Sequence, residues 1–306
     1  MGHGRWSTHT WQSWTAHNSA GRSAAEIFDT RALLPEFDPA LIRMRESRDS
    51  EDNPLSTPIV LASDVTGSLG EVARVLVQDK LGLLVAEILA RKPVTDPHIM
   101  AVAVGDAFCD QAPLQATQFE ADIRLAEQMR RLYVEGGGGG NGGESYALPW
   151  LFCGTKTALD SVSRRGKKGY LFSFGDEPIL PVVTRDQARR FVGVEAEREL
   201  TAAECLALAQ RSFEVFHVLL REGYSAAEPG FRGALASWRP LLGERVLVLD
   251  DYNNLAELVV SAIQVAEGWD AGAVAASWSP AAAASVRGAL GPPRPAGRAP
   301  RTGWFR

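Results

Sequence analysis

The first chemically informative residues are an acid and two hydroxyls at alternate positions. Asp64, Thr66 and Ser68 follow an apolar run over residues 59–62. One carboxylate and two hydroxyls at this spacing form an all-oxygen set that suits a hard divalent cation such as Mg²⁺, Mn²⁺ or Ca²⁺. Asp followed by Thr and Ser is also an ordinary helix N-cap. The spacing alone leaves a metal site and a helix cap as equal alternatives.

Two further segments bring polar side chains to the same predicted edge. Residues 136–145 read Gly-Gly-Gly-Gly-Gly-Asn-Gly-Gly-Glu-Ser and lead into a predicted helix. This loop carries three polar side chains, namely Asn141, Glu144 and Ser145. Asp176 follows a later apolar run that ends at Phe174. Ligands of doubly wound sheets bind beyond the carboxyl ends of the strands, so we expect these side chains to lie near Asp64.

From residue 57 onward, short apolar runs alternate with helical periodicity. The runs are rich in β-branched or aromatic residues, as buried parallel strands are, and cover 59–62, 99–104, 170–172, 215–220 and 246–249. Helices are predicted at 69–91, 119–132, 144–164, 185–192, 201–212 and 254–267. Residues 113–118 follow the second strand too closely for a helical crossover and predict an antiparallel edge strand. The alternation predicts a Rossmann-like, doubly wound α/β fold with a mostly parallel sheet.

The order of these features resembles a von Willebrand factor A (vWA) domain with its metal-ion-dependent adhesion site (MIDAS). The family pattern is Asp-x-Ser-x-Ser after the first strand, a Thr in a glycine-rich loop and an Asp after a later strand. In this chain Asp64, Thr66 and Ser68 match the first element. Asn141 stands where the loop Thr would be, and Asp176 matches the last Asp. The resemblance implies a Mg²⁺ (or Mn²⁺ or Ca²⁺) site formed by these five residues.

The resemblance covers about residues 57–268. Three further polar residues are candidates for contacting the metal ligands without binding the ion themselves. Glu144 follows Asn141 by three residues, as a Glu does in a Gly-Gly-Gly-Asp variant of the family loop, and Ser145 follows it. Asp106 is the third supporting candidate and is equally readable as a simple turn residue. The loop over 136–143 is expected to be mobile and to order when a partner's carboxylate arrives.

The segments on either side of this region have different compositions. Residues 1–56 are expected to be an N-terminal arm and a charged connection, in which Trp6, Trp11 and Trp14 dock on a neighbouring surface. Residues 269–306 are rich in Ala, Pro and Arg and predict a mobile tail.

Composition excludes several classes of protein. A net charge of −5 argues against a dedicated nucleic-acid binder, because phosphate contacts need clustered Lys and Arg. The three cysteines are far apart and indicate neither a disulfide framework nor a zinc site. No apolar stretch is long enough to span a membrane, so we expect no membrane role. We expect a cytoplasmic location instead. The Gly-x-x-x-x-Gly-Lys phosphate loop is absent from the sequence.

The resemblance implies a metal-dependent module that binds an Asp or Glu of a protein partner. The stretches over 45–50 and 113–115 resemble bacterial vWA proteins that accompany MoxR-type AAA+ ATPases, sometimes in conflict systems. The alternative is a metal-dependent, phosphatase-like hydrolase that uses the same acids. A haloacid-dehalogenase-type phosphatase needs a second Asp where Thr66 stands, so binding is favoured over catalysis.

Overall fold

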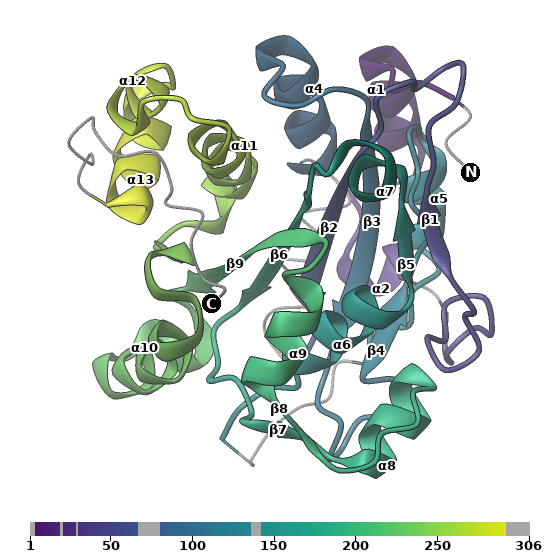
Figure 1. The fold of residues 1–306 in the computed structure, drawn as a ribbon. Coiled ribbons are helices and arrows are strands. Elements are labelled where there is room, and N and C mark those ends of the chain that lie inside the picture. Colours follow the sequence, from purple (N-terminus) through teal and green to yellow (C-terminus); the bar gives the residue numbers. More distant parts are fainter. Residues whose placement is uncertain (1–3, 19–20, 29, 67–79, 136–141, 292–306) are drawn as a thin grey trace, which may run out of the picture.

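The computed structural model describes residues 4–18, 21–28, 30–66, 80–135 and 142–291 (Figure 1). The strands are β1 (Arg45–Ser47), β2 (Thr57–Asp64), β3 (Pro97–Val104), β4 (Leu114–Ala116), β5 (Thr157–Leu159), β6 (Gly169–Gly175), β7 (Val182–Val183), β8 (Leu200–Thr201), β9 (Phe213–Leu220) and β10 (Val246–Leu249). The longer helices are α1 (Thr8–Asn18), α4 (Leu81–Arg91), α6 (Ala147–Thr155), α9 (Ala202–Ala209), α10 (Glu228–Leu242), α11 (Leu255–Ala266) and α13 (Pro280–Leu290). Shorter ones are α2 (Ala24–Ile27), α5 (Arg124–Met129), α7 (Asp160–Arg165), α8 (Arg185–Gln187), η3 (Ala188–Val192), η4 (Gly223–Ala226), η5 (Gly243–Arg245), η6 (Tyr252–Asn254) and α12 (Ala271–Ala276).

Within the described residues the central sheet has six strands in the order β10-β9-β6-β2-β3-β4. All neighbours pair in parallel except β4, which runs antiparallel to β3 at the edge. In the middle, Val60 of β2 lies opposite Met100 of β3 and Leu171 of β6. The predicted doubly wound α/β fold with one antiparallel edge strand is therefore confirmed.

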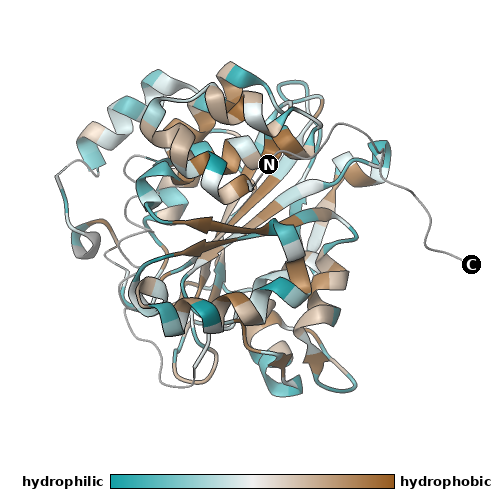
Figure 2. Ribbon diagram, turned by 90° about the vertical axis from the view of Figure 1, so that its left-hand side faces the viewer, coloured by the Kyte–Doolittle hydropathy of each residue, from teal (hydrophilic) through white to brown (hydrophobic). Residues whose placement is uncertain are grey.

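The sheet separates two hydrophobic layers, because successive residues of a strand point to opposite faces. Ile59 and Leu61 pack with α4, α5 and α11, whereas Val60 and Ala62 pack with α6, α9 and α10. Figure 2 shows the hydrophobic strands lying between helices of mixed hydropathy. Burial on both faces explains why the strands are continuous apolar runs rather than alternating ones.

Helix ends follow local sequence signals. α4 buries Leu81, Leu84, Val85 and Ile88, which recur at the spacing of one helical face. Thr201 starts α9 with a capping box, in which its hydroxyl accepts the backbone N–H of the third helical residue. Among the described residues, no helix is long and apolar enough to cross a membrane.

The predicted helix over 144–164 is wrong in its middle. It is split into α6 and α7 by β5, which pairs in parallel with β1. β1 lies within the segment expected to be a charged connection, and its Arg45 is buried and donates to the carbonyl of Ala116 at 2.8 Å. The charged residue Arg45 therefore belongs to the packed fold rather than to a solvated connection.

Of the two flanking segments, the N-terminal one packs on the domain as expected and the C-terminal one does not. Docking of the N-terminal Trp residues is confirmed, since Trp11 is buried and the indole of Trp6 donates to the carbonyl of Pro97 at 2.8 Å. The mobile C-terminal tail is wrong for 271–290, which form α12 and α13. Ala favours helix, and small side chains let α13 pack against α11 and β10. Residues 292–306 lie outside the described residues.

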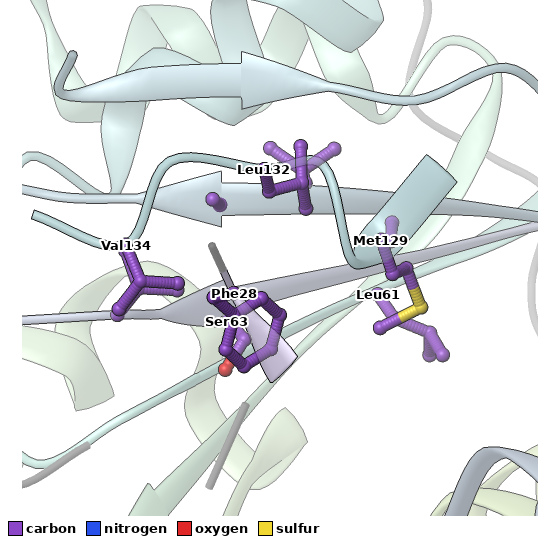
Figure 3. Close-up of a pocket in the computed structure, with 10 residues that line it drawn as sticks. Phe28, Leu61, Ser63, Met129, Leu132 and Val134 are labelled. Atoms are coloured by element: carbon purple, nitrogen blue, oxygen red, sulfur yellow. The ribbon is translucent and has the colours of Figure 1, made fainter. Parts of the chain in front are cut away.

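A small apolar cavity lies on one face of the sheet (Figure 3). Leu61 of β2 and Met129 of α5 line it, together with Phe28, Leu132 and Val134. Its volume of about 20 Å³ leaves room for about one water molecule. The cavity is therefore a packing gap of the core.

Candidate functional site

Three neighbouring parallel strands end at the same edge of the sheet. β2 ends at Asp64, β3 ends at Val104, which lies opposite Asp64, and β6 ends one residue before Asp176. Asp106 follows β3 by two residues. The topology thus places three buried acids at the carboxyl end of the sheet, where ligands of this fold class bind.

Asp64 and Thr66 are in direct contact. One Asp64 oxygen, Oδ1, accepts the Thr66 backbone N–H at 2.8 Å and the Thr66 hydroxyl at 2.7 Å. This is also the pattern of a side chain that closes a turn, so the helix-cap interpretation and the metal interpretation use the same two residues. Asp64 is 1% exposed, although it stands at the end of a strand.

Glu144 lies next to this pair. Its Oε1 is 3.3 Å from the Thr66 hydroxyl oxygen, and its Oε2 is buried without a hydrogen-bond partner among the described residues. The backbone of Glu144 is fixed on both sides, because its N–H donates to Pro178 and its carbonyl accepts from Leu180. The start of α6 therefore holds this carboxylate at the end of β2.

Tyr146 is a site residue that the sequence analysis missed. Its hydroxyl donates to Asp64 Oδ2 at 2.7 Å, and the ring is fully buried. A Cβ on Gly175 would stand 1.8 Å from this hydroxyl, so only Gly fits there. The Gly that precedes Asp176 in the sequence is the signal that could have indicated a close approach at this position.

Asp176 is at the expected edge but is engaged elsewhere. Its Oδ2 accepts the backbone N–H of Tyr224, and its own carbonyl accepts the hydroxyl of Ser225. Both partners belong to η4, which follows β9. Asp176 therefore ties the β6 turn to the neighbouring loop.

The two other supporting candidates organise the turn after β3. Asp106 accepts the backbone N–H of Phe108 at 2.9 Å and the Cys109 thiol at 3.1 Å. The Ser145 hydroxyl accepts the backbone N–H of Ala107 at 3.0 Å. Asp106 thus fits its turn interpretation, and Ser145 joins the start of α6 to the same turn.

Two predicted ligands lie outside the described residues. These are Ser68 and Asn141, together with most of the glycine-rich loop over 136–143. The described part of the site consists of Asp64, Thr66, Glu144, Tyr146 and Asp176.

Burial shapes the charge of the site. Burial raises the pKa of Asp64 against the lowering effect of its hydrogen bonds, and the charge of Asp176 adds to the rise. Burial also raises the pKa of Glu144, as do the charges of Asp64 and Glu177. Within the described chain, no Lys or Arg forms an ion pair with Asp64, Glu144 or Asp176. Among the described residues, the acids therefore have no basic side chain that offsets the charge of their ionised forms.

The residues present fit a hard cation in chemistry. Among the described residues, the polar side-chain atoms that converge at the end of β2 are oxygens, from Asp64, Thr66, Glu144 and Tyr146. In the parts of the chain that the structure describes, no group of three or more His, Cys, Asp or Glu side chains is arranged to hold a metal ion. The predicted set does not require one, since it combines two carboxylates with hydroxyl and amide oxygens.

Comparisons with known proteins find only distant structural similarity. No family model and no curated protein matches the chain. The pilus adhesin SpaC from Lactobacillus rhamnosus GG, in its open conformation, aligns at 8% identity and a TM-score of 0.42, over 72% of this chain and 31% of the adhesin. Another structure of SpaC aligns at 9% identity and a TM-score of 0.44, over 72% of this chain and 32% of the adhesin. The chain thus spans about a third of the adhesin's length, and similarity at this level carries no argument about function.

Proposed function

We propose that the chain is a metal-dependent protein-interaction module of the vWA type. In this proposal Asp64 and Thr66 hold a Mg²⁺, Mn²⁺ or Ca²⁺ ion at the end of the central strand, with Ser68, Asn141 and Asp176 completing the predicted set. The observation that carries it is a buried cluster of acids, Asp64, Glu144 and Asp176, in which, among the described residues, no Lys or Arg forms an ion pair and one oxygen of Glu144 has no hydrogen-bond partner. Such an arrangement is unfavourable in a protein interior unless a cation or bound protons offset the charge.

A bound divalent ion would supply positive charge and an open coordination position, which an Asp or Glu of a partner can fill. The surface around the site supports a protein partner. Phe108 and Tyr224 are exposed, and their backbone N–H groups donate to Asp106 and Asp176. Exposed aromatic rings beside a charged site are typical of protein interfaces. A MoxR-type AAA+ ATPase is the partner class that the sequence resemblance implies.

Calorimetric titration with Mg²⁺ and Mn²⁺ tests the metal site. The wild-type chain should bind the ion, and Asp64→Asn should lose that binding, because the substitution removes a charge but keeps the shape. Glu197→Gln is the matched control, since it removes an exposed acid of the same class. Equal binding by the wild type and Asp64→Asn would refute the site.

Partner binding is tested separately with a peptide library that presents single Asp or Glu residues. Capture should occur with Mg²⁺, and it should disappear with EDTA or in Asp64→Asn. Phosphatase, nuclease and protease assays on the same proteins distinguish a hydrolase from a binding module. A hydrolytic activity that Asp64→Asn abolishes would replace binding as the function.

A further inference from the structure

We infer that Glu144, rather than Asp176, supplies the second carboxylate of the metal site. This inference rests on the function proposed above, and it changes which acid touches the ion.

The Thr66 hydroxyl lies between two carboxylates but has a single hydrogen. The shorter contact, 2.7 Å, directs that hydrogen to Asp64 Oδ1. The second contact, 3.3 Å to Glu144 Oε1, then joins two oxygens that both carry lone pairs. Two such oxygens stay together in a buried site only if a proton or a cation lies with them.

Glu144 also has a second carboxylate oxygen, Oε2. This oxygen is buried and has no hydrogen-bond partner in the part of the chain that the structure describes, and the whole residue is 0% exposed. The backbone holds the side chain in place, since the Glu144 N–H donates to Pro178 at 2.9 Å and Leu180 donates to the Glu144 carbonyl at 3.1 Å. A Cβ on Gly143 would approach the Pro178 carbonyl oxygen to 2.7 Å, so Gly permits this close pairing. The carboxylate is thus held at the end of β2, and no Lys or Arg of the described residues forms an ion pair with it.

Asp176 is placed differently. Its Oδ2 accepts the backbone N–H of Tyr224, and the Ser225 hydroxyl binds the carbonyl of the same residue. In the described structure no hydrogen bond joins the Asp176 side chain to Asp64 or Thr66. Asp176 thus serves the loop between β6 and η4, and its charge acts on Asp64 across space.

Mn²⁺ titration of three charge-matched variants tests this assignment, with electron paramagnetic resonance of free Mn²⁺ and calorimetry as readouts. Glu144→Gln should weaken Mn²⁺ binding by about 100-fold or more, because a direct ligand loses its charge. Asp176→Asn should weaken Mn²⁺ binding much less, so that its Mn²⁺ affinity stays at least about tenfold higher than that of Glu144→Gln. Glu177→Gln removes a nearby acid that forms no hydrogen bond with Asp64 or Thr66. This variant should weaken Mn²⁺ binding by about threefold at most.

Glu144→Gln also separates a metal ligand from a protonated acid. Gln has the shape and the hydrogen-bond donor of a protonated Glu. Unchanged Mn²⁺ affinity would therefore show that a proton, and not the metal ion, lies between Glu144 Oε1 and the Thr66 hydroxyl, and it would overturn the inference. Glu144→Asp keeps the charge but withdraws the carboxylate by one methylene. Its affinity should fall by about tenfold or more, because ligand distances are tightly constrained. Far-UV circular dichroism in EDTA confirms that each variant folds.

The outcomes distinguish this inference from the proposed function. If the wild-type chain binds no Mn²⁺, both are wrong. If it binds Mn²⁺ and Asp176→Asn abolishes binding while Glu144→Gln does not, the metal site stands and only the assignment of Glu144 is overturned. If Glu177→Gln weakens binding as much as Glu144→Gln does, general electrostatics explains both losses and the assignment is again overturned.

Discussion

Buried acids that lie side by side hold their protons more tightly than exposed acids do. Asp64 and Glu144 are both buried, and burial raises the pKa of each. The charge of Asp64 further raises the pKa of Glu144, and the charge of Asp176 further raises that of Asp64. Tyr146 partly offsets this effect, since its hydroxyl donates to Asp64 and stabilises the ionised carboxylate. The pair is thus poised between holding a proton and holding a metal ion.

We predict that Mg²⁺ binding releases protons and strengthens as the pH rises. Because the pKa values of Asp64 and Glu144 are raised, protons compete with Mg²⁺ at pH values where exposed acids are already ionised. Affinity should rise by up to about tenfold per pH unit for each proton displaced. Calorimetry at pH 6 in buffers of different ionisation enthalpy measures the released protons. A binding enthalpy that is the same in every buffer would contradict the prediction.

The residues of the site were only partly predictable from the sequence. Asp64 and Asp176 could be found because each follows an apolar strand directly. The role of Tyr146 could not be read locally, since its contact with Asp64 depends on the distance between two elements that are 82 residues apart. The position of Glu144 depends likewise on its bridge with Ile179.

At the scale of elements, strands were easier to predict than helices. Five of the six strands of the central sheet correspond to continuous apolar runs, because both faces are buried, and β4 was predicted from its closeness to β3 instead. α10 was missed, since it contains two prolines and two glycines, which ordinarily break helices. β1 was missed because three residues that include two charges carry no strand pattern. Its partner β5 supplies the pairing that stabilises it.

Two strands carry buried histidines that should make the fold sensitive to acid. His98 in β3 is 0% exposed, and its Nδ1 contacts the Ser47 hydroxyl at 3.1 Å. Its Nε2 has no hydrogen-bond partner within the described ranges of the chain. Burial lowers the pKa of His98 from 6.5 to about 4. Burial likewise lowers the pKa of His217 in β9 well below its ordinary value.

We predict that His98→Gln reduces the loss of stability in acid. Between about pH 6.5 and pH 4 the unfolded chain binds a proton that the folded His98 does not, so this stability is present above the unfolded pKa and is lost as the pH falls. From pH 7 to pH 5 the wild type should lose about 2 kcal/mol more than His98→Gln. Urea denaturation at both pH values measures the difference. Parallel losses in the two proteins would contradict the prediction.

At the scale of the whole molecule, the C-terminal helices extend the folded unit beyond the sheet. α12 and α13 bury Val274 and Val286, and the Arg91 guanidinium of α4 lies 3.4 Å from the centre of the Trp278 ring. These contacts join residues near the end of the described chain to α4. Composition could not reveal this, because an Ala-rich, Pro-containing segment fits a tail as well as a helix.

We predict that a chain ending at Gly268 is less stable than one ending at Gly291. The shorter chain loses the apolar contacts of α12 and α13, which should cost roughly 3 kcal/mol or more of unfolding free energy. Urea denaturation followed by circular dichroism compares the two chains, and the chain ending at Gly291 is the control that keeps both helices. Equal midpoints would show that these helices do not contribute to the fold.

The central place of β2 has a mechanical consequence for any partner held at its end. β2 pairs with β3 along 57–64 and with β6 along 59–63, and both neighbours run parallel to it. A pull on Asp64 along the strand axis therefore loads two rows of hydrogen bonds in shear at the same time. An edge strand such as β10 has one row only. β2 is held along both of its sides, so a partner bound at Asp64 should detach before the strand is extracted.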